Sequence, residues 1–143
     1  MDTETPKGRP AVKGKFIYKG GEKLYLKGAT YGTFRPIDGS HFPEYGTVKN
    51  DLAMMSACGF NCIRTYTVPP LFLLDIAHSL DMLVMVGLPW EQHITFLEDH
   101  NTVKNIIRRV KEGVMLCRDH PAVLCYAIGN EIPAGIVRWY GKE

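Results

Sequence analysis

The stretch V-L-C-Y-A-I-G-N-E-I-P, residues 123–133, begins as an apolar, β-prone run and ends in a glycine, an amide and a carboxylate. A short continuous apolar run that is bounded by turn signals indicates a strand buried on both faces. Such strands are typical of parallel sheets whose faces are covered. We therefore predict a strand over residues 122–128, with Asn130 and Glu131 just beyond its carboxyl end.

Three more strands are predicted upstream of this one. Residues 60–66, F-N-C-I-R-T-Y, and 83–88, L-V-M-V-G-L, are β-prone runs of strand length. An earlier run, 23–26, is expected to continue through Lys27, Gly28 and Ala29 and to end at Tyr31-Gly32. The sequence therefore predicts four strands that are well separated along the chain.

Segments with helical periodicity separate these strands. Apolar residues recur at steps of three or four in three places: Val48, Leu52 and Met55; Leu73, Ile76, Ala77 and Leu80; and Val103, Ile106, Val110, Val114 and Cys117. We expect Thr47 to cap the first helix, Asn101 or Thr102 to cap the third, and Gly59 to end the first. The final residues, 133–143, are expected to begin a fourth helix.

The N-terminal part of the chain has a different character. Residues 1–11 are polar and contain two prolines, so we predict a flexible tail, followed by one domain over 12–143. Two β-prone runs, 15–18 and 23–26, flank Gly20-Gly21, which predicts a β-hairpin.

The order of these elements predicts an α/β fold, because strands that alternate with helices form parallel sheets. Two architectures fit the order: an open doubly wound sheet, or part of a (β/α)8 barrel. A full barrel takes about 250 residues, and 143 residues supply about four of its eight βα units.

Composition and charge exclude several classes of function. The formal net charge is +2 and no basic stripe is visible, so nucleic acid is not an expected partner. No apolar run is long enough to span a bilayer, and the polar start does not resemble a signal peptide, so we expect a cytoplasmic protein. Four cysteines, Cys58, Cys62, Cys117 and Cys125, are expected to be free thiols, and no cofactor or metal site is predicted.

Polar and aromatic side chains are expected where the strands end. In parallel α/β folds the site lies beyond the carboxyl ends of the strands. Arg64 and Tyr66 close the second predicted strand, Trp90 follows the third, and Asn130-Glu131 follow the fourth. Hydrogen-bonding groups next to aromatic rings suit a sugar, and Tyr66 and Trp90 are candidates for stacking on it. Glu91, by contrast, is expected to be a surface carboxylate.

Three segments carry a resemblance to a known family. The segments G-F-N-C-I-R-T-Y (59–66), L-D-M-L-V-M-V-G-L-P-W (80–90) and R-D-H-P-A-V-L-C-Y-A-I-G-N-E (118–131) resemble a clan A glycoside hydrolase barrel. The resemblance is strongest to family 2, the β-galactosidase and β-glucuronidase group. It implies the first half of a TIM (β/α)8 barrel, with a glycosidase function that hydrolyses O-glycosidic bonds of the β configuration by a retaining mechanism.

The same resemblance implies roles for three residues. Glu131 would be the general acid/base, Asn130 would hydrogen-bond the sugar 2-hydroxyl, and Arg64 would lie near the nucleophile. The nucleophile of this clan comes from the seventh strand, so we expect it to be missing from this chain and the isolated chain to be inactive unless pairing completes the barrel. The alternative is a non-catalytic half-barrel that binds carbohydrate or serves in assembly. In either case two copies could close one barrel as a homodimer.

Overall fold

The computed structural model describes residues 8–37 and 39–141 and has the predicted alternation of strands and helices. Four strands form one sheet: β4 (Gly28–Thr30), β5 (Cys62–Arg64), β6 (Leu83–Gly87) and β7 (Val123–Ala127). Three helices connect them: α1 (Tyr45–Ala57), α2 (Leu71–Ser79) and α3 (His100–Cys117). A fourth helix, α4 (Ala134–Tyr140), follows β7, as predicted.

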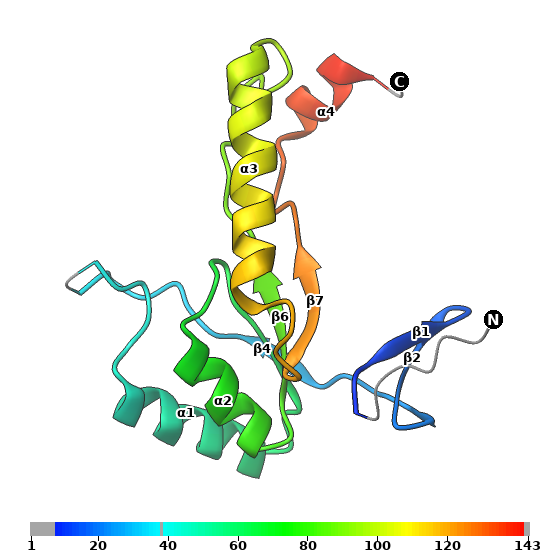
Figure 1. Cartoon of the computed structure of the whole chain (residues 1–143), viewed down its shortest axis with the longest axis vertical. Coiled ribbons are helices and arrows are strands. Elements are labelled where there is room, and N and C mark those ends of the chain that lie inside the picture. The colour runs from blue at the N-terminus through cyan, green and yellow to red at the C-terminus, as the bar shows by residue number, and fades with distance from the viewer. Residues whose placement is uncertain (1–7, 38, 142–143) are drawn as a thin grey trace.

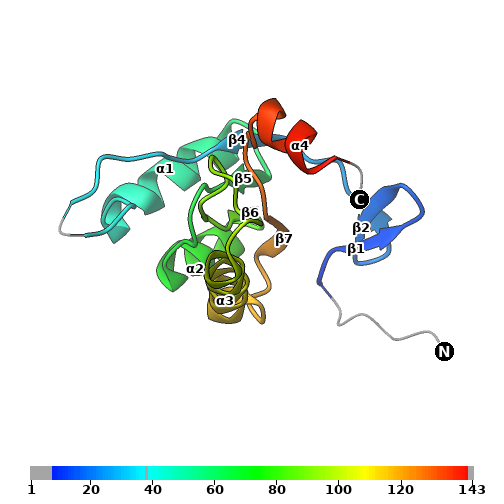
Figure 2. The same cartoon turned by 90° about the horizontal axis from the view of Figure 1, so that it is seen from above.

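The order of the strands decides between the two predicted architectures. All three strand pairs are parallel, and the order β4-β5-β6-β7 repeats the order in the sequence. Helices α1, α2 and α3 lie on the same side of the strands, which follow one another in a curved row (Figure 1 and Figure 2). A doubly wound sheet reverses its strand order at a switch point, whereas a barrel does not. The fold is therefore a partial TIM barrel.

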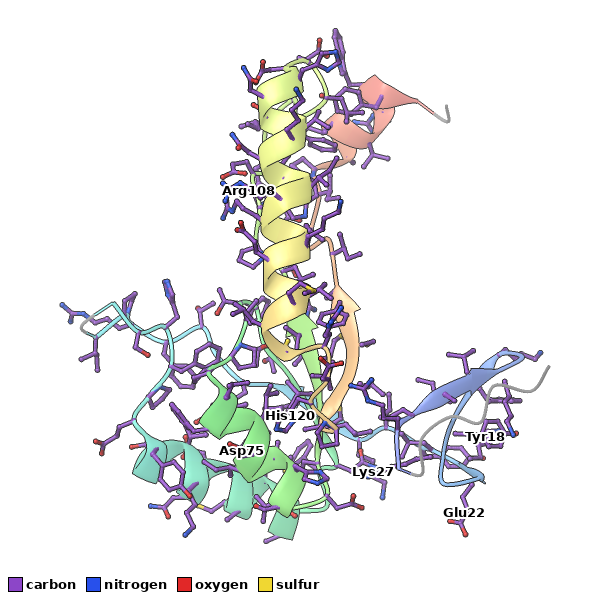
Figure 3. All side chains as sticks on the ribbon, in the orientation of Figure 1. Tyr18, Glu22, Lys27, Asp75, Arg108 and His120 are labelled. Atoms are coloured by element: carbon purple, nitrogen blue, oxygen red, sulfur yellow. The ribbon has the colours of Figure 1, made fainter. Side chains whose placement is uncertain are left out.

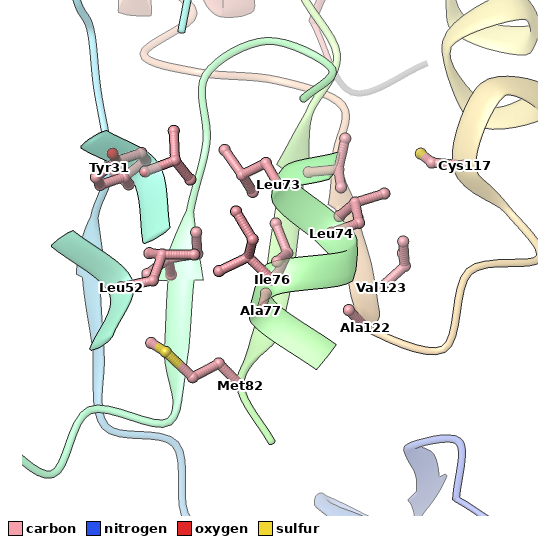
Figure 4. Close-up of a cluster of buried hydrophobic side chains, with 14 of the residues drawn as sticks. Tyr31, Leu52, Leu73, Leu74, Ile76, Ala77, Met82, Cys117, Ala122 and Val123 are labelled. Carbon is pink, nitrogen blue, oxygen red and sulfur yellow. The ribbon is translucent and has the colours of Figure 1, made fainter. Parts of the chain in front are cut away.

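A hydrophobic core fills the space between the sheet and the helices (Figure 4). It includes Ile63 and Val84 from the sheet, which are neighbours in register and fully buried, and Leu52 and Leu73 from α1 and α2. The opposite face of the sheet is less covered, since Thr30 is exposed and Arg64 is only half-buried. Because side chains alternate between the two faces of a strand, one face builds the core and the other lines the partial barrel.

Three short strands precede the barrel segment. The strands β1 (Ala11–Lys13), β2 (Phe16–Lys19) and β3 (Glu22–Lys23) form an antiparallel sheet in that order. The predicted hairpin is confirmed, and both Gly20 and Gly21 have positive φ at its turn. The prediction that the run 23–26 continues as one strand into the barrel is wrong, because residues 24–27 are not in a strand and β3 and β4 belong to different sheets. Of the predicted tail, residues 1–7 lie outside the described residues, and Ala11 is already the first residue of β1.

The R-D-H-P segment lies at the amino end of β7 and holds α2 against it. His120 Nε2 is 3.1 Å from Asp75 Oδ1 on α2, and His120 Nδ1 accepts a hydrogen bond from the Ala122 backbone N–H. The two side chains lie side by side (Figure 3). Since Nδ1 accepts, Nε2 carries the proton and donates to Asp75. This segment therefore has a structural role at the end of the strand opposite Asn130.

The predicted helix caps are wrong in both cases. Helix α1 begins two residues before Thr47, after Glu44, and its Tyr45 packs on Phe72 with ring centroids 5.9 Å apart. Tertiary packing therefore extends this helix past its local signal. The cap of α3 is Asp99, whose Oδ2 accepts hydrogen bonds from the backbone N–H and the hydroxyl of Thr102. Gly59 ends α1 with φ of +86°, as predicted.

The Asp99 cap makes stability depend on pH. The hydrogen bonds from Thr102 lower the pKa of Asp99, so the folded chain favours the ionised carboxylate more than the unfolded chain does. The contribution of the ionised Asp99 cap to folding stability is therefore complete above the unfolded pKa of about 3.9, and it is lost as pH falls through the lower pKa of the folded chain. We expect the stability advantage of the wild type over Asp99→Ala, measured from urea midpoints, to shrink below about pH 4.

Asp99→Asn is the matched control, because asparagine caps a helix without titrating. Its advantage over Asp99→Ala should stay constant over the same pH range, since every other group titrates alike in the two variants. If the advantage of the wild type over Asp99→Ala were equally constant, the carboxylate would not be the capping group.

Candidate active site

The carboxyl ends of β5 and β7 are joined by a side-chain hydrogen bond. Arg64, the last residue of β5, donates from Nη2 to Oδ1 of Asn130, which follows β7. A guanidinium can only donate, so this contact assigns the oxygen of the Asn130 amide to the Arg64 side. The Asn130 Nδ2 group is then left to donate to another partner. The structure thus brings together two of the residues that the sequence places in one site.

Arg64 is held from a second direction by Tyr66. The guanidinium carbon lies 5.0 Å from the centroid of the Tyr66 ring, a cation–π arrangement. The Arg64 Nε group is buried and has no hydrogen-bond partner in residues 8–37 and 39–141. A buried donor without an acceptor is costly, and a charged one more so. Arg64 is therefore suited to receive a further anionic or polar acceptor.

Gly87, the last residue of β6, allows the backbone that follows β5 to approach it closely. A Cβ atom at Gly87 would lie 2.5 Å from the Thr65 carbonyl oxygen and 2.6 Å from the carbonyl carbon and oxygen of Tyr66. These are backbone atoms, so they cannot move aside as a side chain could. Gly87 thereby positions Arg64 and Tyr66, and sequence reasoning missed it, although a glycine closing an apolar strand is a sign of close backbone approach.

The loop after β6 contacts the segment after β7 through two side chains. The Trp90 indole N–H donates to the Ile128 carbonyl, and the Gln92 Oε1 accepts a hydrogen bond of 2.7 Å from the Asn130 backbone N–H. Trp90 is half-buried and meets Phe96 edge-on, with centroids 4.8 Å apart. Sugar stacking by Trp90 stays a prediction. Gln92 was not anticipated, because a loop glutamine carries no signal in the sequence.

Glu131 lies next to these groups but does not contact them. Its side chain is exposed and forms no hydrogen bond or ion pair with the part of the chain that the structure describes. Its φ of +53° is in the left-handed region, which is uncommon for a residue other than glycine. Outliers of this kind cluster at functional sites. The structure therefore places Glu131 beside the Arg64–Asn130 pair without bringing its carboxylate to the guanidinium.

Glu91, a second carboxylate near the carboxyl end of β6, already has a partner. Glu91 forms an ion pair with Arg109 on α3. Both side chains remain partly exposed, as in an ordinary surface pair. Glu91 is therefore the surface carboxylate that the sequence predicted.

The cysteine thiols are poorly suited to act as nucleophiles. All four cysteines are free thiols, as predicted, although Cys58 and Cys125 are exposed. Burial, with a smaller effect from Cys125, raises the pKa of the Cys62 thiol to about 11, and burial also raises the pKa values of Cys117 and Cys125. A protonated thiol is a poor nucleophile. The residues that the structure describes contain no group of three histidine, cysteine or acidic side chains able to hold a metal ion.

Most of the chain matches a known protein family. The family described as "Glycosyl hydrolases family 2, TIM barrel domain" matches residues 11–139, which is most of the chain. The chain belongs to this family. The predicted resemblance to family 2 is therefore confirmed, as is the partial barrel.

Individual relatives of this glycosyl hydrolase family 2 chain are much longer than it is. A β-galactosidase of Staphylococcus xylosus is 27% identical to this chain in a match that covers 85% of this chain and 14% of that protein. A β-glucuronidase structure from Parabacteroides merdae matches with a TM-score of 0.71 and 24% identity, covering 86% of this chain and 16% of that one.

A further structural match is a Ruminococcus gnavus β-glucuronidase in complex with a C6-substituted uronic isofagomine. It has a TM-score of 0.71 and 21% identity, and covers 92% of this chain and 23% of that one. At such identities the structural matches establish the fold. The chain thus spans less than a quarter of each of these relatives. In the described residues no helix has both the length and the apolar character needed to cross a membrane.

Proposed function

We propose that this chain supplies the acid/base side of the active site of a retaining β-glycosidase. The observation that carries the proposal is the hydrogen bond from Arg64 to Asn130, which joins the carboxyl ends of β5 and β7. Glu131 is the next residue along the chain. A glycosidase of this kind needs a proton donor for the leaving oxygen and a hydrogen bond to the sugar, and in this proposal Glu131 and Asn130 supply them.

Asn130 is the sugar-binding group in this proposal. Its oxygen accepts from Arg64, so its Nδ2 group is free to donate to the sugar 2-hydroxyl. A hydrogen bond to that hydroxyl strengthens as positive charge develops on the ring in the transition state. Arg64 therefore serves the reaction by fixing which end of the Asn130 amide meets the substrate.

Glu131 is the general acid/base. Its carboxyl is free of protein partners in the described residues, so it is available to protonate the leaving oxygen and then to deprotonate a water molecule. Its left-handed backbone turns the chain sharply directly after Asn130. The amide and the carboxyl are thereby presented from consecutive residues at one strand end.

The nucleophile comes from outside these 143 residues. A retaining mechanism requires a second carboxylate about 5–5.5 Å from the first. The buried and unpaired Arg64 Nε supports such an arrangement, because a carboxylate next to it would satisfy the donor and would itself be held ionised. The proposed substrate class is a β-linked sugar, and the named activities of the relatives, β-galactosidase and β-glucuronidase, define the first candidates.

The test compares two forms of the protein on aryl β-galactosides and β-glucuronides. One form is the purified 143-residue chain, and the other is a polypeptide in which these residues form part of a complete barrel. We expect the complete form to hydrolyse one of these substrates and proton NMR to detect the β-anomer as the first product. Release of the α-anomer first would contradict the retaining mechanism.

The same experiment tests a second candidate, a non-catalytic half-barrel for carbohydrate binding or assembly. The observation that favours it is that β4 and β7 each pair with only one strand within the described residues, so both edges of the sheet are available. Binding of sugar by both forms without turnover, together with a light-scattering mass of two chains for the 143-residue form, would support this candidate and the homodimer.

A further inference from the structure

The hydrogen-bond ladder between β6 and β7 continues past the strands through side chains. The last backbone bond runs from Leu88 N–H to the Ala127 carbonyl, at 3.0 Å. Beyond it the Trp90 indole N–H donates to the Ile128 carbonyl, and the Gln92 side chain accepts from the Asn130 N–H. Two side chains of one loop thus take the place of the backbone partners that a longer β6 would provide.

From this geometry we infer that Gln92 is a positioning residue that fixes the direction of Asn130 and, through it, of Glu131. The inference deepens the proposed function, on which its consequence for catalysis rests. The hydrogen bond itself does not depend on that function. Gln92 contacts neither the predicted sugar nor the reacting atoms, and it acts through the backbone of Asn130.

Asn130 is restrained from two different strands. Its backbone N–H is held at 2.7 Å by Gln92, from the loop after β6, and its side-chain oxygen is held by Arg64, from β5. With both ends fixed, the residue has little freedom left to rotate. This matters because the next residue, Glu131, adopts a backbone conformation that a non-glycine residue rarely occupies.

The local surroundings are built to hold Gln92 in place. The Gln92 N–H donates to the Trp90 carbonyl at 2.8 Å, so the two contact residues form one tight turn. The chain after β7 lies close to the glutamine, since a Cβ atom at Gly129 would be in ordinary contact with Gln92 Oε1 at 3.9 Å and would lie 3.2 Å from an Ile132 methyl. A backbone N–H can only donate, so Oε1 is the end of the amide that faces Asn130.

The first test measures the hydrogen bond in the 143-residue chain. Gln92→Met keeps the length of the side chain and removes the strong acceptor, whereas Gln92→Glu keeps an acceptor at the same position. We expect amide hydrogen exchange at Asn130, followed by NMR, to be about tenfold or more faster in Gln92→Met, in line with the loss of one hydrogen bond. It should stay slow in Gln92→Glu.

Two controls separate this effect from general loosening of the loop. Leu88 N–H, the last backbone bond of the ladder, should exchange at the wild-type rate in both variants. Thr95→Val, an exposed position in the same loop, should leave the Asn130 rate unchanged. An unchanged Asn130 rate in Gln92→Met overturns the inference, and so does equal acceleration at Leu88.

The second test measures the catalytic consequence in a polypeptide that contains these residues as part of a complete barrel. Misplacement of a site residue by about 1 Å can cost up to a hundredfold, so we expect Gln92→Met to lower kcat by about 10- to 100-fold with little change in KM. In an Asn130→Ala background the backbone N–H of residue 130 can still bind Gln92, so the same change should still lower kcat, but by a smaller factor than in the wild type, because only the placement of Glu131 is then lost. Additive losses would overturn the inference. Absence of any glycosidase activity would refute the proposed function, and the exchange rates would then decide the positioning role alone.

Discussion

Replacing Glu131 with glutamine is expected to lower kcat/KM for β-glycosides with poor leaving groups by about 10²- to 10⁴-fold, the usual contribution of a general acid. Glutamine keeps the shape of the side chain but cannot donate a proton to the leaving oxygen. The loss should be much smaller for activated aryl glycosides, whose leaving groups need little protonation. The measurement is the steady-state rate, on a series of such substrates, of a polypeptide that contains these residues as part of a complete barrel.

Glu91→Gln is the matched control for this substitution. Glu91 is also a glutamate close to a strand end, but it forms an ion pair with Arg109 on the outer helix α3. Its replacement should leave the rates within about twofold of wild type, because surface ion pairs contribute little. If the two substitutions had the same effect, the assignment of Glu131 would be wrong.

Chemical rescue sharpens the Glu131 test further. Azide is a small anionic nucleophile that needs no general base, so it should restore turnover of activated substrates by Glu131→Gln and form a β-glycosyl azide. Trapping of a covalent glycosyl intermediate on Glu131 itself would give that residue the role of nucleophile and contradict the proposal.

Replacing Gly87 with alanine is expected to lower the free energy of unfolding by about 3 kcal/mol, the upper part of the range for overpacking a core. The added methyl group would meet the backbone of Thr65 and Tyr66 at 2.5–2.6 Å, so β5 and β6 would have to separate. The separation would also displace Arg64, which hydrogen-bonds Asn130. Urea unfolding of the 143-residue chain measures the change.

Gly46→Ala provides the comparison. Gly46 lies in α1, and a Cβ atom there has no neighbour within 4 Å. Alanine is the better helix former, so this substitution should raise the free energy of unfolding by about 0.5–1 kcal/mol. An identical urea midpoint for Gly87→Ala and the wild type would show that the two strands do not approach as closely as the structure has them.

The strands and helices themselves could be predicted because their signals are local. Short apolar runs predicted β5, β6 and β7, and helical spacing predicted α1, α2 and α3. The first residues of the helices were harder to predict from the sequence. Asp99 caps α3 in place of Asn101 or Thr102, and the packing of Tyr45 extends α1. The identity of a cap depends on which side chain reaches the free N–H groups, and neighbouring residues of similar type cannot be separated by spacing.

The candidate site was predictable only in part, for a related reason. The rule that ligands bind beyond the carboxyl ends of parallel strands placed Arg64 and Asn130 in one region, and the structure joins them by a hydrogen bond. The rule says nothing of Gln92 or Gly87, whose roles come from one contact each. Nor does it say how the carboxylate of Glu131 is directed, which depends on a single backbone angle.

The sequence by itself determined the alternation of strands and helices, the polar ends of the strands and the family, because periodicity and short motifs are properties of consecutive residues. The tertiary structure alone decided that the strands run in barrel order and that Arg64 holds the oxygen of Asn130. It also decided that a loop glutamine extends the ladder of β6 and β7. These contacts join residues 38 and 66 positions apart, and only the folded chain sets the distance between them.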